Sequence, residues 1–220
     1  MAVNIEKYKK IRTDLMGKQV TLVAVSKTKP NEDIQALYDL GQRDFGENYV
    51  QELVDKHAAL PKDIHWHFIG HLQSNKVKYI APFVHLIHGV DSLKLLQEIN
   101  KQAAKSGRKI DCLLQVHIAQ EETKFGMDEA ELEVARSSMA ELPNVRIIGM
   151  MGMASFSEDL QKVRGEFHYL KTLYTKYNEL GIVSSELRIL SMGMSGDYTI
   201  AIEEGSTMVR IGSLLFGARE

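Results

Sequence analysis

This sequence has only one cysteine and a small net charge. The 220 residues include one cysteine, Cys112, and a single cysteine excludes an internal disulfide bond. Because Cys112 lies inside an apolar run typical of a strand, we expect a small buried side chain and not a nucleophile. The net charge of -2 gives no basic surface for a nucleic acid, so we expect no nucleic-acid partner.

Long hydrophobic runs are missing as well. The longest apolar stretches are far too short to span a membrane, and the first residues, MAVNIEK, lack the apolar core of a secretory signal. We therefore expect a cytoplasmic protein with no membrane partner. The hydrophobic content of 44% is ordinary for a globular protein, and no linker, low-complexity tract or repeat interrupts the chain. These features favour a single domain over residues 1–220.

The chain does contain a regular alternation of strand-like and helical patterns. After an amphipathic helix at 4–16, strand-like runs lie at 20–26, 43–46, 64–69, 83–89, 110–118, 145–151, 187–192 and 207–211. Helical periods separate them, at 31–40, 47–58, 73–80, 91–105, 128–140, 157–179 and 196–203. This pattern predicts an α/β fold, a (β/α)8 TIM barrel with an extra N-terminal helix. An open doubly wound sheet is the alternative, but no G-x-G-x-x-G motif follows the first strand.

In such a barrel, functional residues lie where strands end and the following loops begin. Lys27 stands at the tip of the first strand and shares a strand face with Val23 and Val25. We expect this face to point inward, where burial lowers the pKa of a lysine and makes it a candidate for Schiff-base chemistry. A solvated loop lysine with no role in binding is the alternative interpretation.

Two loops rich in glycine and serine follow the seventh and eighth strands. One contains Ser195, and the other begins with Gly212 and Ser213. Small residues let a backbone approach a ligand closely, and barrels often bind phosphate between these two loops. The sequence therefore predicts a phosphate site here, with ordinary turns as the alternative.

Arg210 interrupts the apolar eighth strand. It should point inward if Val209 and Ile211 pack outward against helices, and a buried arginine needs an acceptor. A carboxylate is one candidate acceptor, and the ring nitrogen of a heteroaromatic ligand is another. An inward lysine, a phosphate site and an inward arginine together suit pyridoxal 5′-phosphate, which presents an aldehyde, a phosphate and a pyridine nitrogen to these three groups.

The chain resembles the pyridoxal-phosphate homeostasis proteins, relatives of the N-terminal barrel of alanine racemase. The matching motifs are AVSKTKP at 24–30, FGENYVQE at 45–52, WHFIG at 66–70, LQSNK at 72–76, SMGMSGD at 191–197 and GSTMVRIG at 205–212. The resemblance implies one (β/α)8 barrel with Lys27 as the Schiff-base lysine and Asn48 beside the cofactor. It implies that Ser195, Gly212 and Ser213 hold the phosphate and that Arg210 faces the pyridine nitrogen. His71 matches a variable position, so we expect no catalytic role for it.

Efficient catalysis is not expected. Arginine cannot accept a hydrogen bond, so Arg210 favours an unprotonated pyridine nitrogen, which is a poor electron sink. In alanine racemases a tyrosine from a partner subunit supplies a second acid/base group, whereas this chain ends at Glu220 without the domain that builds the dimer. Tyr49 and Tyr198 are the candidates for a substitute. We expect a monomeric carrier that takes part in vitamin B6 and amino-acid homeostasis and passes the cofactor to apo-enzymes, with a racemase as the alternative.

One further function and one further kind of site were considered from the sequence. A phosphate-ester-binding barrel enzyme without a Schiff base would use the same loops. A metal site is not expected. His65 and His67 share a strand face, but no carboxylate or cysteine completes a tetrahedral site with the histidines at 65, 67, 71, 85 and 88.

Overall fold

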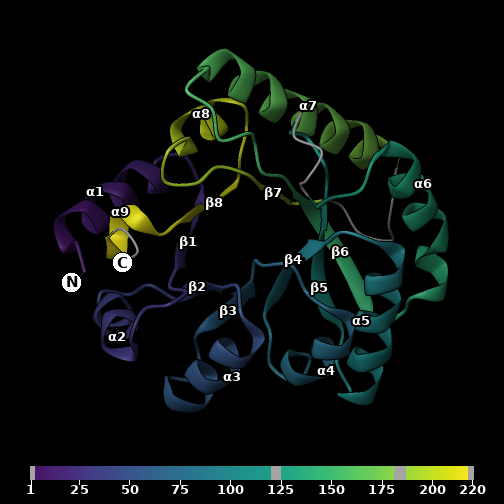
Figure 1. Cartoon of the computed structure of the whole chain (residues 1–220), viewed down its shortest axis with the longest axis horizontal. Helices are drawn as coiled ribbons and strands as arrows, with labels where there is room; N and C mark the ends of the chain where they lie inside the picture. The colour runs from purple at the N-terminus through teal and green to yellow at the C-terminus, as the bar shows by residue number, and fades with distance from the viewer. Residues whose placement is uncertain (1–2, 120–124, 181–186, 218–220) are drawn as a thin grey trace.

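The alternating pattern folds as a closed barrel of parallel strands. The computed structural model describes residues 3–119, 125–180 and 187–217. In these residues eight strands pair in chain order, and β1 pairs with β8 to close the ring (Figure 1). The strands are β1 (Thr21–Val25), β2 (Asp44–Glu47), β3 (His65–Phe68), β4 (Leu86–Val90), β5 (Ile110–Gln115), β6 (Val145–Met151), β7 (Ile189–Ser191) and β8 (Met208–Ile211).

Helices surround the ring of strands (Figure 1). The α-helices are α1 (Ile5–Met16), α2 (Asn31–Asp39), α3 (Val50–Ala59), α4 (Val77–Ile80), α5 (Leu93–Lys105), α6 (Glu129–Ser138), α7 (Leu160–Glu179), α8 (Tyr198–Glu203) and α9 (Ser213–Phe216). Two 3-10 helices are η1 (Ser74–Lys76) and η2 (Met139–Glu141). Within the described ranges, none of the helices combines the length and apolar character needed to cross a membrane.

This architecture confirms the predicted (β/α)8 TIM barrel and its extra N-terminal helix, α1. The side chain of Asn4 accepts a hydrogen bond from the backbone N–H of Lys7 and so caps the first turn of α1. Helix α1 then lies beside α9, joined by a hydrogen bond from the backbone of Asn4 to that of Leu215. The single domain over residues 1–220 stays a prediction, since both of its ends lie outside the described residues.

Alternation along each strand divides the apolar side chains between two cores. Val209 and Ile211 of β8 pack outward with the helices, as expected, while Met208 joins a smaller cluster inside the barrel. Cys112 is fully buried in the outer core, which confirms the prediction of a buried side chain, and burial raises the pKa of its thiol. The lumen also encloses polar side chains, and these lead to the functional site.

Candidate functional site

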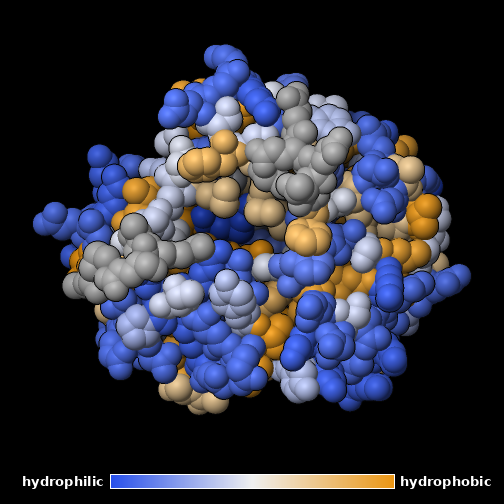
Figure 2. All heavy atoms as spheres, viewed as in Figure 1, coloured by the Kyte–Doolittle hydropathy of each residue, from blue (hydrophilic) through white to orange (hydrophobic). Residues whose placement is uncertain are grey.

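A cavity of about 420 Å³ opens among the loops that follow the strands. Figure 2 shows a hollow near the centre of this face, with hydrophilic atoms at its floor. All six residues that the sequence marked for binding line the one cavity: Lys27, Asn48, Ser195, Arg210, Gly212 and Ser213. Its volume falls in the usual range for small-molecule sites, roughly 300–1,000 Å³. The fold therefore brings the predicted residues together, and their roles in binding stay predictions.

Lys27 is half-buried and follows β1 directly. Val23 of that strand belongs to the inner core and Val25 lines the cavity, so the strand face that leads to Lys27 points inward as predicted. Two glutamate side chains bind the residues on either side of Lys27. The Ser26 hydroxyl donates to Glu47 Oε1 at 2.6 Å, and the Thr28 N–H donates to Glu52 Oε1 at 2.5 Å.

A buried ion pair supports this turn. Lys56 Nζ, on α3, donates to Glu47 Oε1 at 2.9 Å, to Glu52 Oε1 at 2.6 Å and to the carbonyl of Ser26 at 2.8 Å. Glu47 is fully buried, and burial raises the pKa of its carboxyl group while the charge of Lys56 acts against the rise. Thr28 adopts a left-handed backbone (φ 64°), which needs such outside support in a non-glycine residue. The ion pair therefore fixes the loop that presents Lys27.

Arg210 is buried at the floor of the cavity and points inward, as the strand pattern predicted. Its acceptors are the Ser191 carbonyl at 2.9 Å, the Ser191 hydroxyl at 2.7 Å and the Gly152 carbonyl at 3.1 Å. Burial lowers the pKa of Arg210 to about 10, so the guanidinium stays protonated at neutral pH. Among the described residues, its Nε–H and one N–H of Nη2 keep no acceptor, and both belong to a side chain that lines the cavity.

A chain of hydrogen bonds continues from Arg210 through the lumen. Ser191 Oγ lies 3.2 Å from His88 Nδ1, and His88 Nε2 lies 2.9 Å from His67 Nδ1. His67 Nε2 lies 3.0 Å from Asp44 Oδ1 at the other end of the barrel. Arginine only donates, so the Ser191 hydroxyl accepts from it and donates to His88; the two imidazoles then each donate onward, ending at the carboxylate. Burial lowers the pKa of His88 well below its ordinary value, so the His88 imidazole is uncharged at neutral pH.

The two loops of the predicted phosphate site meet at the cavity. The backbone N–H of Gly212 donates to Ser195 Oγ at 3.3 Å, which joins the loop after β7 to the loop after β8. Gly193 starts the first loop with φ 95°, and a Cβ there would lie 2.6 Å from Ala201 Cβ, so only glycine fits. The Asp197 carboxylate accepts the Met194 N–H at 2.5 Å and shapes the rest of the turn.

Asn48 presents an unpaired group beside the cavity. Its Oδ1 atom is buried and has no hydrogen-bond partner among the described residues. A buried polar atom without a partner costs free energy, so it marks a place for a ligand's donor.

Nine further residues line the cavity besides the six that the sequence marked for binding. The further lining residues are Val25, Lys29, Ile69, Met153, Phe156, Met194, Gly196, Asp197 and Gly217. Met194, Gly196 and Asp197 belong to the motif at 191–197. Phe156 lies in a loop after β6, and no sequence pattern indicated that it lines the cavity. None of the described lining residues is a tyrosine, and Tyr49 is exposed on the surface. His71 also lies outside the lining, where its Nδ1 is 2.9 Å from Asp91 Oδ2.

Histidines gather at the opposite, amino end of the strands. The expectation that no carboxylate joins His65 and His67 is wrong, because Asp44 lies beside both. Asp44 Oδ1 lies 3.2 Å from His65 Nδ1 and 3.0 Å from His67 Nε2. His85 joins them, and its ring stacks on that of His65 with centroids 4.4 Å apart. Strand register brought these residues together, and sequence spacing gave no sign of it.

Comparison with known proteins gives a consistent result. The family model for the alanine racemase N-terminal domain matches residues 4–220. The pyridoxal phosphate homeostasis protein of Aquifex aeolicus is 44% identical over 200 residues, covering 90% of this chain and 87% of the relative. The human protein of the same name is 40% identical over 220 residues, covering 94% of this chain and 79% of the relative.

Solved structures agree on the fold. PipY of Synechococcus elongatus without pyridoxal phosphate superposes with a TM-score of 0.90 at 35% identity, covering 96% of this chain and 99% of PipY. PipY with pyridoxal phosphate bound gives a TM-score of 0.87 with the same coverage. Alanine racemase from Bartonella henselae, at 16% identity and a TM-score of 0.70, shares the fold; the match covers 97% of this chain and 59% of that one.

Proposed function

The chain belongs to the family of the alanine racemase N-terminal domain and, within it, to the pyridoxal phosphate homeostasis proteins, and from this premise we propose that it binds pyridoxal phosphate in the cavity beside Lys27. It would hold the cofactor as a Schiff base and take part in vitamin B6 and amino-acid homeostasis. The observation that carries the proposal is the convergence of the six residues predicted to bind this cofactor on one cavity of about 420 Å³.

The groups around the cavity fit such a ligand. Arg210 keeps two N–H groups without an acceptor among the described residues, and these suit a pyridine nitrogen. The buried Asn48 Oδ1 awaits a donor at the same cavity. Ser195 and the backbone of Gly212 supply small polar groups in two adjoining loops, which suits a phosphate.

Each residue has a distinct part in holding the cofactor. When bound, pyridoxal phosphate supplies an aldehyde and an electron-withdrawing ring. Lys27 would hold the cofactor through its amine, the group that reacts with an aldehyde. Ser195, Gly212 and Ser213 would hold the phosphate, and Arg210 would donate to the ring nitrogen. The ion pair of Glu47 and Lys56 holds the lysine loop in place.

We propose a carrier and not an efficient enzyme. Arg210 stays protonated at neutral pH and cannot accept a hydrogen bond, so it favours an unprotonated ring nitrogen and limits carbanion chemistry. The described lining residues offer no tyrosine as a second acid/base group. We further propose that the protein is monomeric and cytoplasmic and that it delivers the cofactor to apo-enzymes. Size-exclusion chromatography with light scattering tests whether it is a monomer.

Borohydride trapping tests the ligand and the residue together. The protein is incubated with pyridoxal phosphate, reduced with borohydride, digested and mapped by mass spectrometry. We expect a pyridoxyl adduct on the peptide that contains Lys27, with loss of the visible chromophore on reduction. Lys29 also lines the cavity and is the matched control: Lys27→Ala should lose the adduct, and Lys29→Ala should keep it.

Two results would overturn parts of the proposal. An adduct confined to Lys29, or none at all, would remove the Schiff base on Lys27 and favour a phosphate-ester-binding barrel. Rapid racemisation of an amino acid, abolished in Lys27→Ala, would establish a racemase in place of a carrier.

A further inference from the structure

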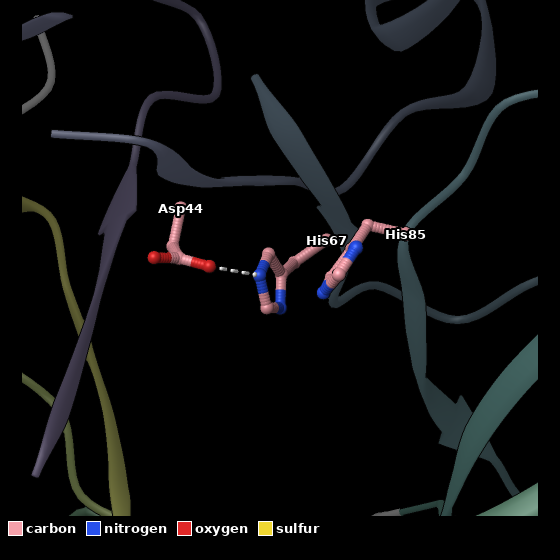
Figure 3. A group of neighbouring side chains, drawn as sticks. All are labelled: Asp44, His67 and His85. Carbon is pink, nitrogen blue, oxygen red and sulfur yellow. Dashed lines mark hydrogen bonds and ion pairs between the residues drawn. The ribbon is translucent and has the colours of Figure 1, made fainter. Parts of the chain in front are cut away.

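The amino end of the barrel brings together three metal-ligating side chains, far from the cofactor cavity in the fold. Asp44 is the first residue of β2, His67 lies within β3 and His85 immediately precedes β4. One ligand atom from each lies within 4.8 Å of the other two. Figure 3 shows Asp44 and His67 facing each other, with the ring of His85 beside that of His67.

The spacing of these atoms is close to that of a coordinated metal. Asp44 Oδ1 and His67 Nε2 are 3.0 Å apart. In a tetrahedral zinc site with bonds of 2.0–2.1 Å, two neighbouring ligand atoms are about 3.3 Å apart. The rings of His67 and His85 have centroids 5.4 Å apart, and a ring nitrogen of His85 lies within 4.8 Å of the ligand atoms of Asp44 and His67.

The His67 ring has a fixed orientation, as the ring of a metal-ligating histidine needs. Its side chain is 1% exposed, and its second ring nitrogen, Nδ1, lies 2.9 Å from His88 Nε2. Ligating histidines usually donate the N–H of their other ring nitrogen to a fixed partner, which orients the ring. His88 is itself fixed, because its Nδ1 lies 3.2 Å from the Ser191 hydroxyl. A metal on His67 Nε2 would shift the ring proton of His67 to Nδ1, which would then donate to His88 Nε2, and His88 would carry its own proton on Nδ1.

The site also has an entry path. His85 is exposed, and the Asp44 side chain is 27% exposed, so an ion reaches them from solvent. His65 lines the approach: its Nδ1 is 3.2 Å from Asp44 Oδ1, and its ring stacks on His85 with centroids 4.4 Å apart. Three protein ligands leave a fourth position for water or for His65.

We propose that Asp44, His67 and His85 bind one divalent transition-metal ion, such as zinc, at the amino end of the barrel. Two imidazoles and one carboxylate favour Zn²⁺, Co²⁺ or Ni²⁺ over Mg²⁺ or Ca²⁺, which prefer oxygen ligands alone. The site replaces the sequence expectation of no metal, and it does not depend on the proposed binding of pyridoxal phosphate.

Metal titration of the full chain tests the site. Chelator-treated protein is titrated with Zn²⁺ in a calorimeter and with Co²⁺ in an absorption spectrometer. We expect one ion per chain and the intense visible bands of low-coordinate cobalt. His85→Ala and Asp44→Asn should each weaken binding at least tenfold, and both change partly exposed side chains that the barrel tolerates. His168→Ala removes a surface histidine paired with Glu204 and is the matched control, with unchanged affinity expected.

Circular dichroism of each variant checks that the fold is kept. The proposal is overturned if the wild-type protein shows no saturable binding of one ion. It is overturned equally if His85→Ala and Asp44→Asn bind both ions as tightly as the wild-type protein, or if His168→Ala alone loses the ion. Adding pyridoxal phosphate should leave the count at one ion per chain, which separates this site from the cofactor cavity.

Discussion

Replacing Lys56 with methionine is expected to destabilise the protein strongly. Methionine keeps most of the apolar length of lysine but removes the cation that Glu47 contacts at 2.9 Å. Glu47 is fully buried and the Lys56 side chain is 6% exposed, so the substitution leaves a carboxylate in the interior without its partner. Removing one partner of such a pair costs about 3–5 kcal/mol. For a chain of this size that corresponds to a fall in Tm of about 6–20 °C.

Urea unfolding followed by far-UV circular dichroism measures the loss. Lys176→Met is the matched control, because Lys176 also pairs with a glutamate, Glu129, but both side chains are about half exposed. Solvent screens such a pair, so we expect a far smaller change in the free energy of unfolding. If Lys56→Met and Lys176→Met lose the same small amount, the buried ion pair does not have the role assigned to it.

The free energy of unfolding that Lys56→Met loses should also depend on pH, and the structure gives the direction. Burial already raises the pKa of Glu47 in the folded protein, and the charge of Lys56 holds part of that rise back. Without Lys56 the folded pKa rises further, so the folded state loses stability as pH increases through that pKa. The gap between Lys56→Met and the wild-type protein should therefore narrow in mildly acidic buffer, when the carboxyl group is protonated. A gap that widens as pH falls would contradict this assignment.

Three further substitutions test other contacts. Gly193→Ala should destabilise the protein by more than about 1 kcal/mol in the same urea assay, because its backbone is left-handed and the new methyl group meets Ala201; Gly17→Ala, in open space, should not. Ser191→Ala removes a partner of both Arg210 and His88 and should cost about 1–3 kcal/mol, measured in the same way. Arg210→Lys should weaken pyridoxal phosphate binding in a fluorescence titration by roughly 10–100-fold, since charge-assisted hydrogen bonds are lost.

Strand periodicity predicted which side chains near the cavity face the barrel interior. Strand alternation assigned Val209 and Ile211 to the outer core and Arg210 to the lumen, and the structure agrees with all three. The same rule placed Lys27 inward at the end of β1. These predictions succeeded because a parallel strand in a barrel buries both faces, so an isolated polar residue in an apolar run must face the lumen.

The sequence did not predict contacts between side chains of two separate elements. Asp44 and His67 are 23 residues apart and meet because β2 pairs with β3 in a register that sets Asp44 beside His65. Lys56 occupies an ordinary charged position in the pattern of α3, and nothing there indicated that its amine reaches the buried Glu47. Both cases depend on which side chains two separate elements present to each other; between strands, a shift of one residue in register changes that choice.

The hydrogen-bond chain through the lumen links the proposed metal site to the cavity and predicts that the two affect each other. In the present arrangement Ser191 donates to His88, His88 to His67 and His67 to Asp44. A metal on His67 Nε2 moves the proton to Nδ1, so His88 must accept at Nε2 and donate from Nδ1 to the Ser191 hydroxyl.

Ser191 would then receive hydrogen bonds from both His88 and Arg210, and its own proton would lose its acceptor. This disturbs the support of Arg210, so zinc should weaken pyridoxal phosphate binding. Couplings between sites are typically about 1–3 kcal/mol, or roughly 5–150-fold in affinity, and they are reciprocal. Fluorescence titrations of pyridoxal phosphate with and without zinc measure the effect, and it should vanish in His85→Ala. Equal affinities in the wild-type protein with zinc bound would show that the chain does not transmit the change.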